Sequence, residues 1–381
     1  MAEIDMSAPR VFIYVQHLLG IGHLVRANRI ASALVDDGFD VALATGGLPV
    51  PGFPGPGIRK IALPPIKAGS GGFSTLEDAN GRPVDDGFKH LRRNELIAAL
   101  QDFKPDAVIV ETFPFGRRAM RFEVLPFLDA ALLLAQRPLI ACSVRDILQQ
   151  NHKPGRVEET INTIEKYFDI VLVHSDPSYA AFGETFPQAE ALTNKILYTG
   201  LVAGPLPAAP AEHYDIVISA GGGAVGRELV IAAAQMAKQL DKAIRCCLIT
   251  GPNMPPLELG SLKAGAGPGL EIFSFRDDFP SLLVGARLSV SQAGYNTLCD
   301  ILRAGCRSLL IPFAKNGETE QTSRALRLKK LGLAHVLFED ELSTSKLTRA
   351  VQNAIGEPAP LPHGFNLEGA KQTAALIRSR I

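Results

Sequence analysis

Short apolar runs alternate with helix-length amphipathic segments along the chain, beginning at residue 10. Residues 10–35 contain a strand-like run, a glycine turn and an amphipathic helix, and residues 214–240 repeat this order. A second short β-rich run follows each unit, DVALAT at 40–45 and AIRCCLIT at 243–250. Apolar strands that alternate with helices indicate βαβ units and a parallel sheet. The pattern therefore predicts an α/β protein whose two halves have the same design.

Further strands are expected wherever a strand-length apolar run recurs. In the first half these runs are IRKIAL, DAVIVE, PLIACSV and DIVLVHS, and in the second half they are LEIFSF, RLSVSQ and SLLIPF. Residues 66–87 are polar and rich in glycine, which is more typical of a mobile loop than of a packed element. After a proline-rich break at 358–362, residues 366–380 are expected to form a last helix.

Chain length and one biased segment predict two domains. A chain of 381 residues is long for a single core. The segment GLVAGPLPAAPAEH has the Pro, Gly and Ala content of a linker. We expect an N-terminal domain over 1–200, a linker over 201–213, a C-terminal domain over 214–362 and a C-terminal helix over 363–381. In doubly wound sheets ligands bind beyond the carboxyl ends of the strands, so the turns at those ends are the places to search.

Composition narrows the class of protein. An apolar share of 46% with 20% charged residues is typical of a globular protein, and 39 basic against 39 acidic residues argue against a general nucleic-acid binder. No apolar run reaches the about 20 residues that span a bilayer, and MAEIDMSAPR lacks the layout of a signal peptide. Five cysteines without a CxxC pair suggest neither a disulfide framework nor a structural zinc site. We therefore expect a reduced, cytoplasmic protein.

The first candidate turn is HLLGIGH, from His17 to His23. Its glycine pair permits a sharp turn and brings a ligand close to backbone N–H groups at a helix start. A dinucleotide site is disfavoured, because Val25 replaces the third glycine and the next strand ends in ATGG without an acid. The helix dipole would keep the imidazole of His23 neutral and able to accept a proton, although a histidine that only caps the helix fits equally well.

The second candidate turn, residues 221–226, matches the spacing GxGxxG. This spacing alone is weak evidence, and the next strand ends in LITGPN, without the acid expected for NAD. A phosphate or diphosphate resting on the helix N-terminus is one interpretation. A glycine turn that serves only tight packing is the other, and the sequence leaves both open.

Two further turns carry polar residues at expected helix starts. SVSQAGYNTLCDILRAG, residues 289–305, leads from a strand through a small polar turn into a helix that contains Asp300. IPFAKNGETEQTSRA, residues 311–325, leads into a helix that begins with Glu320 and Gln321. Asp300 could accept both hydroxyls of a ribose, and Glu320 or Gln321 could bond the hydroxyls of a sugar. Acids early in a helix are also expected for dipole reasons alone.

Charged residues also stand at strand ends in the first half. DAVIVET ends at Glu111, and SVRDIL contributes Arg145 and Asp146. These side chains are candidates for binding an acceptor or for assisting a base. The arginines of ETFPFGRRAMRF could meet an anionic acceptor or a lipid surface, although a solvated helix face is the ordinary explanation.

Taken together, these turns resemble a known family. FRDDFPSLLVGARLSVSQAGYNTLCDILRAGCRSLLIPF and ETEQTSRALRLKKLGLA are similar to MurG-type glycosyltransferases, which make lipid-linked peptidoglycan precursors, and to their GT-B relatives. GIGH at 20–23 resembles the GGH turn of the family, and GGGAVGRE resembles its second glycine loop. ETFPFGRR, SVRDIL and SQAGYNT are most similar to an uncharacterised branch of predicted glycosyltransferases. The resemblance implies two Rossmann-like doubly wound domains that face each other across a cleft, with the C-terminal helix packing back on the N-terminal domain.

The resemblance also implies an inverting hexosyl transfer from a nucleotide-sugar, with the donor on the C-terminal domain and the acceptor on the N-terminal one. Asp300 matches the acid that holds the nucleotide ribose. Gly294 and Thr297 match the turn that faces the diphosphate, and Glu320 and Gln321 match the sugar-contacting pair.

For the general base the resemblance favours His23, which matches the histidine of the glycine turn, with Glu111 as the second choice. Two departures from the family, Ile21–Gly22 in the first turn and Gln292 before the third, leave the acceptor unidentified. The other expected donor-binding residues are Gly222, Gly223, Arg227 and Asn296, and the expected acceptor-binding residues are His17, Gly22, Arg145 and Asp146.

No cofactor is expected, because the nucleotide-sugar is a substrate. No metal ion is expected either, because the sequence has no convincing DxD motif. Asp277–Asp278 lacks the spacing of a DxD metal motif, and EDE at 339–341 lies beyond the donor turns. Helix N-termini would then take the place of a metal as the positive pole for the leaving diphosphate. Two alternatives remain: a GT-B nucleotide-sugar 2-epimerase or hydrolase, and an inactive sugar-nucleotide-binding subunit.

The expected partners are a nucleotide-sugar, for which UDP is the favoured carrier, and a sugar or lipid-linked acceptor in cell-envelope or exopolysaccharide synthesis. No nucleic-acid partner is expected. Peripheral contact with the inner membrane is compatible with a cytoplasmic location. The sequence specifies neither the sugar, the acceptor nor the oligomeric state.

Overall fold

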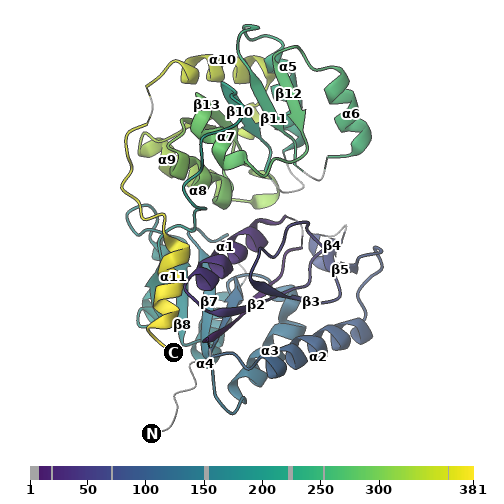
Figure 1. Cartoon of the computed structure of the whole chain (residues 1–381), viewed down its shortest axis with the longest axis vertical. Helices are drawn as coiled ribbons and strands as arrows, with labels where there is room; N and C mark the ends of the chain where they lie inside the picture. The colour runs from purple at the N-terminus through teal and green to yellow at the C-terminus, as the bar shows by residue number, and fades with distance from the viewer. Residues whose placement is uncertain are drawn as a thin grey trace. The chain divides into compact units, whose positions relative to one another are not determined.

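The computed structural model describes residues 8–18, 20–69, 72–149, 154–221, 226–251, 254–358 and 360–381. The chain forms two compact units, shown in Figure 1. Unit 1 extends to Val202 and includes Glu368–Ile381, whereas unit 2 is Ala203–Leu367. Each unit contains one mainly buried parallel sheet, so the predicted α/β class is confirmed.

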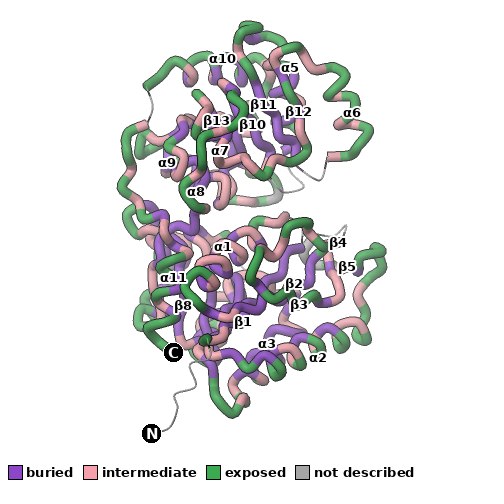
Figure 2. Tube along the Cα trace, viewed as in Figure 1, coloured by how far each residue is buried: buried purple, intermediate pink, exposed green. Residues whose placement is uncertain are grey.

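The sheet of unit 1 is parallel throughout, with the order β3-β2-β1-β6-β7-β8-β9. Its inner strands are buried on both faces, which is the usual state of a parallel sheet covered by helices (Figure 2). The strands are β1 Arg10–Val15, β2 Asp40–Thr45, β3 Ile58–Ala62, β6 Ala107–Glu111, β7 Leu139–Arg145, β8 Ile170–His174 and β9 Ile196–Tyr198.

Helices connect the strands of unit 1, and the last helix of the chain returns to it. The helices are α1 Gly22–Asp36, α2 Asp86–Phe103, α3 Arg121–Leu132, α4 Arg156–Tyr167 and α11 Gly369–Arg378, with short 3-10 turns η1 Arg118–Met120, η2 Phe182–Glu184 and η3 Pro187–Leu192. Helix α11 packs against α1, as predicted. Arg378 Nε donates to Asp37 Oδ2 at 2.7 Å, and a Cβ on Gly369 would lie 2.4 Å from Gly200 O, so only glycine permits this approach.

The expectation of a mobile loop at 66–87 was wrong. β4 Ile66–Gly69 and β5 Gly72–Asp78 pair as an antiparallel hairpin. The backbone N–H of Ile66 donates to Gly46 O at 2.8 Å, which ties the hairpin to the loop after β2. The Asp78 carboxylate orders the following turn by accepting from the backbone N–H of Arg82 at 2.9 Å. Ile66 is buried in the core of unit 1, and Ala68 and Leu76 pack against that core, so the hairpin also has an apolar anchor that its polar and glycine-rich composition hid.

Unit 2 repeats the design with the strand order β12-β11-β10-β13-β14-β15. The strands are β10 Ile216–Ser219, β11 Cys246–Ile249, β12 Leu270–Phe273, β13 Leu288–Ser291, β14 Ser308–Leu310 and β15 His335–Val336. The helices are α5 Arg227–Ala237, α6 Pro256–Ala264, α7 Phe279–Gly285, α8 Tyr295–Ala304, α9 Glu320–Lys330 and α10 Thr344–Ile355, with 3-10 turns η4 Lys315–Gly317 and η5 Glu339–Glu341.

The strand order reverses beside the first strand of each unit. β1 lies between β2 and β6, and β10 lies between β11 and β13. At such a reversal, the loops that leave the carboxyl ends of the two neighbouring strands run to opposite faces of the sheet. The crevice between these loops is where ligands bind in such folds. The turns after β1 and β6 in unit 1, and after β10 and β13 in unit 2, are therefore the positions where the fold favours ligands.

Candidate functional site

The structure brings together the two residues predicted to be catalytic. His23 is the second residue of α1, which follows β1, and Glu111 is the last residue of β6. Because β1 and β6 are neighbours in the sheet, His23 Nδ1 lies 3.0 Å from Glu111 Oε1. The side chain of His23 is 12% exposed and that of Glu111 is 2% exposed. A partly accessible imidazole is thus paired with a carboxylate that solvent barely reaches.

Both oxygens of the Glu111 carboxylate accept hydrogen bonds. Burial by itself raises the pKa of Glu111, but the Arg26 charge and then the His23 hydrogen bond lower it below its usual value. The carboxylate is therefore ionised at neutral pH and can only accept. Its donors are His23 and Arg26 on Oε1, Thr112 Oγ1 at 3.0 Å on Oε1, and Ser143 Oγ at 2.5 Å on Oε2.

This ionised carboxylate determines where the imidazole proton lies. The acceptor-only oxygen of Glu111 lies 3.0 Å from Nδ1, closer than the donor Arg26 Nη2 at 3.3 Å, so we assign the proton of His23 to Nδ1 and the lone pair to Nε2. Burial, and next the charge of Arg117, lower the pKa of His23 well below its ordinary value. Burial, the first cause of this lowered pKa, favours the neutral imidazole that the sequence predicts. Its Nδ1 also faces Glu111, not the backbone, so the ring is not a simple cap.

Three contributors to this site were absent from the sequence prediction. Arg26 lies one turn after His23 on α1 and is buried, and a charged residue on the apolar face of that helix was the available signal. Thr112 has a left-handed backbone with φ 69°, which is uncommon for a β-branched residue and often marks a functional position. Ser143 gave no signal, because a small residue inside an apolar strand fits ordinary packing.

The predicted acceptor-binding residues are placed in different ways. His17 is buried, and its Nε2 lies 2.9 Å from Leu48 O. A Cβ on Gly47 would lie 2.4 Å from the His17 ring, so His17 and the loop after β2 are packed tightly. Gly22 is exposed at the first residue of α1. The position of His17 favours a role in holding the loops after β1 and β2, and acceptor contact stays a prediction.

Arg145 and Asp146 stand at the end of β7, and Arg145 lies near Arg117 of the loop after β6. Asp146 is buried, and Arg145 is the last residue of the strand. Burial, followed by the charge of Arg145, lowers the pKa of Arg117 to about 10. Arg117 Nε donates to Gln16 O at 2.9 Å, which connects this positive region to the turn after β1.

In unit 2 the turn after β13 leads into α8 without a side-chain cap. Gly294 is the N-cap of α8, and it has no side chain to cap the first N–H groups. The first turn, which contains Asn296 and Thr297, has no acidic residue. Asp300 follows in the second turn and is 7% exposed. Because the dipole effect is confined to the first turn, it does not explain an acid at this depth.

The two polar turns of unit 2 are tied to each other by one side chain. Gln321 Oε1 accepts from the backbone N–H of Ala293 and from that of Phe313, both at 3.1 Å. Gln321 therefore fixes the turn before α8 against the loop after β14, and a sugar contact is left to its amide nitrogen. The Glu318 carboxylate accepts from Glu320 N at 2.6 Å and caps α9. Glu320 itself is 5% exposed.

Part of the second glycine turn lies within the described residues. Gly226 has φ 102°, and a Cβ there would lie 2.9 Å from Ala220 Cβ, so tight packing explains this glycine. The predicted donor residues Gly222 and Gly223 lie outside the described residues. Arg227 is 63% exposed and pairs with Glu258 at 2.7 Å, so donor contact by Arg227 stays a prediction.

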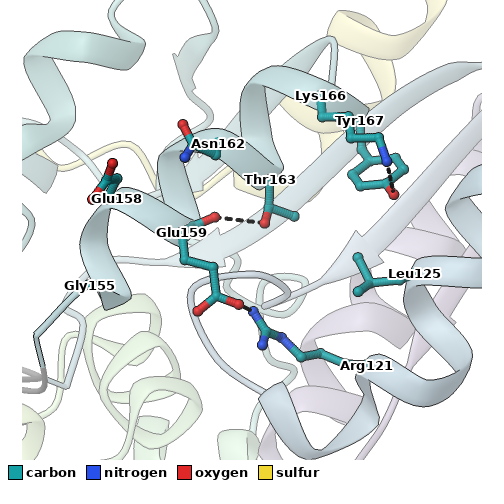
Figure 3. A pocket seen from close by; sticks show the side chains of 9 residues that line it. All are labelled: Arg121, Leu125, Gly155, Glu158, Glu159, Asn162, Thr163, Lys166 and Tyr167. Atoms are coloured by element: carbon teal, nitrogen blue, oxygen red, sulfur yellow. Dashed lines mark hydrogen bonds and ion pairs between the residues drawn. The ribbon is translucent and has the colours of Figure 1, made fainter.

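A surface hollow of about 460 Å³ lies between α3 and α4, away from these residues. Figure 3 shows Arg121 pointing toward Glu159 across it. Arg118 also pairs with Glu159, so the two arginines form ion pairs on a helix surface, as the ordinary explanation expects. None of the predicted site residues lines this hollow.

Over the described residues, no group of three or more His, Cys, Asp or Glu side chains is placed to hold a metal ion. In the same part of the chain, no helix combines the length and the apolar character needed to cross a membrane.

Comparison with known sequences identifies relatives of both units. Residues 216–374 match the glycosyltransferase family 28 C-terminal domain. The UDP-N-acetylglucosamine--N-acetylmuramyl-(pentapeptide) pyrophosphoryl-undecaprenol N-acetylglucosamine transferase of Synechococcus sp. (strain CC9902) is 27% identical over 220 residues, 56% of this chain and 58% of that protein. The protein of the same name from Phenylobacterium zucineum (strain HLK1) is 26% identical over 361 residues, 89% of this chain and 88% of that protein. The alignments to the first two curated relatives thus span little more than half of their length, 58% and 56%.

Solved structures extend the similarity to the whole fold. MurG of Acinetobacter baumannii has a TM-score of 0.56 at 15% identity, and covers 98% of this chain and 95% of its own. The calicheamicin glycosyltransferase CalG4 has a TM-score of 0.61 at 16% identity, with the same coverage of 98% and 95%. At these identities the likeness concerns the fold, which is the GT-B arrangement of two Rossmann-like domains.

Proposed function

Because the chain is a MurG-like protein of the GT-B fold with a family 28 C-terminal domain, we propose that it is an inverting, metal-independent glycosyltransferase. It moves a hexosyl group from a nucleotide-sugar, UDP-linked, to the hydroxyl of an acceptor. The observation that carries the proposal is the contact of 3.0 Å between His23 Nδ1 and Glu111 Oε1. This contact supports a base whose free nitrogen is ready to take a proton.

In this proposal His23 Nε2 removes the proton of the acceptor hydroxyl. The acceptor oxygen forms a bond to the anomeric carbon of the donor while the bond from that carbon to the diphosphate breaks. Attack from the face opposite the leaving group inverts the anomeric configuration. Glu111 stays ionised, holds the ring orientation and stabilises the imidazolium that forms. General-base assistance of this kind is worth about 10²–10⁴-fold in rate.

The donor is assigned to unit 2. The α8 N-terminus, with Gly294 as its N-cap and no acid in its first turn, offers N–H groups to the diphosphate. Asp300 lies one turn deeper and would accept both ribose hydroxyls. Positive potential at the helix N-terminus then stabilises the leaving diphosphate without a metal ion.

The acceptor is assigned to unit 1, beside His23. The names of the two relatives described above include a pyrophosphoryl-undecaprenol acceptor. We propose a sugar or lipid-linked acceptor in cell-envelope or exopolysaccharide synthesis, handled by a cytoplasmic protein at the inner membrane surface. The arginines near the turn after β1, including Arg117, would favour an anionic group on that acceptor.

One experiment separates the proposal from its alternatives. The full chain is screened by thermal shift against UDP-, GDP-, dTDP- and CMP-sugars, because a ligand that binds the native state raises its melting temperature. The stabilising donor is then incubated with EDTA, with and without a panel of sugar and lipid-linked acceptors, and products are identified by mass spectrometry and NMR.

We expect a UDP-sugar to stabilise the protein, and a product of inverted configuration to form only when acceptor is present. Release of free sugar or of a 2-epimer from donor alone would instead identify a hydrolase or an epimerase. Donor binding without turnover over the whole panel would identify a binding subunit, and activity lost in EDTA would overturn metal independence.

A further inference from the structure

A chain of hydrogen bonds continues from Glu111 into the interior of unit 1. Ser143 Oγ lies 2.5 Å from Glu111 Oε2 and 2.8 Å from His174 Nε2. His174 Nδ1 lies 2.8 Å from Thr199 Oγ1. Ser143, His174 and Thr199 are all buried, at 1%, 0% and 0% exposure. We name Glu111, Ser143, His174 and Thr199 the buried polar chain.

The sheet places these residues at the same edge as His23. Ser143 stands directly opposite Glu111 in the register of β6 and β7. His174 is the last residue of β8 and pairs in register with Arg145, two residues after Ser143 on the same face of the strand. The buried polar chain therefore crosses three neighbouring strands at their carboxyl ends, where the proposed base lies.

The proton positions along the buried polar chain follow from the charge state of Glu111. The ionised Glu111 carboxylate only accepts, so the single hydroxyl proton of Ser143 is directed to Oε2. Ser143 then has only lone pairs to offer His174, and His174 Nε2 must carry a proton and donate to Ser143 Oγ. The opposite tautomer of His174 would leave the contact of 2.5 Å between Ser143 and Glu111 without a proton.

The hydroxyl of Thr199, at the far end of the buried polar chain, permits this assignment. With its proton on Nε2, a neutral His174 accepts at Nδ1 from the hydroxyl of Thr199. The same hydroxyl lies 2.9 Å from Gly200 O and 3.4 Å from Val173 O, so three acceptors compete for its proton. Burial, and then the charge of Arg26, lower the pKa of His174 to about 3, which keeps the ring neutral at physiological pH.

We propose that Ser143 and His174 are positioning residues for the His23–Glu111 pair. The Ser143 hydroxyl, oriented by His174, holds Oε2 of Glu111, and this fixes the carboxylate with Oε1 toward His23 Nδ1. The ring proton of His23 is thereby kept on Nδ1, and Nε2 stays free to act as the base. The catalytic consequence rests on the proposed function, whereas the control of the His23 tautomer does not.

The decisive variant is Ser143→Ala, which removes the donor to Oε2 and leaves Arg26, His23 and Glu111 in place. Ser143→Thr keeps a hydroxyl and serves as the conservative rescue. Ser175→Ala is the matched control, because Ser175 is a buried serine of the same unit whose hydroxyl bonds the backbone carbonyl of Ala180 at 2.8 Å. If Ser143→Ala does not fold, His174→Gln, which keeps a donor toward Ser143, is compared with His174→Leu, which does not.

The readouts are the ¹⁵N chemical shifts of the His23 ring in the ligand-free full chain, and kcat and KM for the UDP-sugar and acceptor. We expect wild type and Ser143→Thr to hold the Nδ1–H tautomer, and Ser143→Ala to lose much of it. For Ser143→Ala we also expect kcat to fall about tenfold or more with KM nearly unchanged, because the base loses its orientation.

Two outcomes separate the two proposals. A tautomer change in Ser143→Ala in a protein that transfers no sugar would refute the proposed function and support the positioning role. Changes in tautomer and kcat no larger than those of Ser175→Ala would overturn the positioning role, whatever the activity. If the fallback variants are used, equal changes of the His23 tautomer and of kcat in His174→Gln and His174→Leu would also overturn the positioning role.

Discussion

His23 Nδ1 and Glu111 Oε1 are 3.0 Å apart, although the residues are separated by 88 positions in the sequence. Two parallel strands produce this contact: β1 delivers the helix that carries His23, and β6 ends at Glu111. The carboxylate also receives the buried guanidinium of Arg26. The proposed base, the carboxylate proposed to orient it and the cation paired with that carboxylate are thus joined by the topology of the sheet.

Replacing Glu111 by Gln tests how far this pairing stabilises unit 1. The substitution removes the negative charge that pairs with Arg26, and both side chains are only 2% exposed. Loss of one partner of a buried pair costs about 3–5 kcal/mol, and we expect the free energy of unfolding in urea to fall by that order. Asp86→Asn, at an exposed pair with Lys89 on α2, is the control and should leave the urea midpoint in place. Equal midpoints for Glu111→Gln and Asp86→Asn would contradict the account.

The buried histidines make the stability of unit 1 dependent on pH. Burial is the first cause of the lowered pKa of His17, His23 and His174, and for His174 the value falls to about 3. The unfolded chain, with histidine pKa values of about 6.5, binds more protons than the folded chain below that pH. The contribution of these histidines to the free energy of unfolding is therefore fully present above about pH 6.5. It decreases as the pH falls toward their pKa values in the folded state, by up to about 1.4 kcal/mol per pH unit for each histidine.

Urea unfolding at pH 7.5, 6 and 5 measures this dependence. Between pH 6 and 5, His174→Gln should reduce the slope of unfolding free energy against pH by about one proton equivalent. His90→Gln, at an exposed histidine of α2, is the matched control. A slope that His174→Gln leaves unchanged would show that His174 does not stay neutral in the folded state.

The sequence was a good guide to the regular elements because their signal is local. The apolar runs that end at Val15 and Glu111 form strands there, the run RLSVSQ contains β13, and the helix expected at Glu320 begins there. The hairpin of β4 and β5 was missed, because its few core-facing apolar residues, such as Ile66, are scattered among polar residues and glycines, and its backbone bonds to the loops after β1 and β2 leave no mark in the sequence. The strands β9 and β15 have three and two residues, too few for a periodic pattern to appear.

For the site, the sequence selected candidate residues in the turns and helix starts that follow strands, such as His23 and Asp300, and their roles stay predictions. It could not pair His23 with Glu111, because that contact depends on the order of the strands. It also overlooked Ser143 and His174, which stand in apolar strands and gain their meaning only from one another. Gln321 was expected to contact sugar, and only the structure shows that its oxygen is used by two backbone N–H groups.

Asp300→Asn tests the ribose assignment. We expect the affinity for UDP and UDP-sugar to fall by about tenfold or more by calorimetry, because a hydrogen bond to a charged group is worth roughly 1.5–3 kcal/mol. Asp215→Asn is the control, since Asp215 precedes β10 at the amino end of the same sheet, where its carboxylate accepts from Arg245 N at 2.9 Å. Equal affinities for wild type and Asp300→Asn would remove Asp300 from the donor site.

Gln321→Ala tests whether the link between the two polar turns shapes the donor site. The substitution leaves the backbone N–H groups of Ala293 and Phe313 without their acceptor. We expect a weaker UDP-sugar affinity and a smaller thermal shift with donor, because the turn before α8 loses its fixed position. Gln352→Ala, on the exposed face of α10, is the control. A donor affinity that matches this control would show that the link has no part in binding.

The central claim is that the free nitrogen of His23 removes the proton of the acceptor hydroxyl. The direct measurement compares wild type with His23→Ala for transfer from the stabilising UDP-sugar, together with calorimetric binding of that donor. The account requires kcat to fall by about 10²–10⁴-fold while donor affinity is nearly kept, since His23 lies in unit 1 and the donor is assigned to unit 2. Turnover by His23→Ala at the wild-type rate would contradict the account.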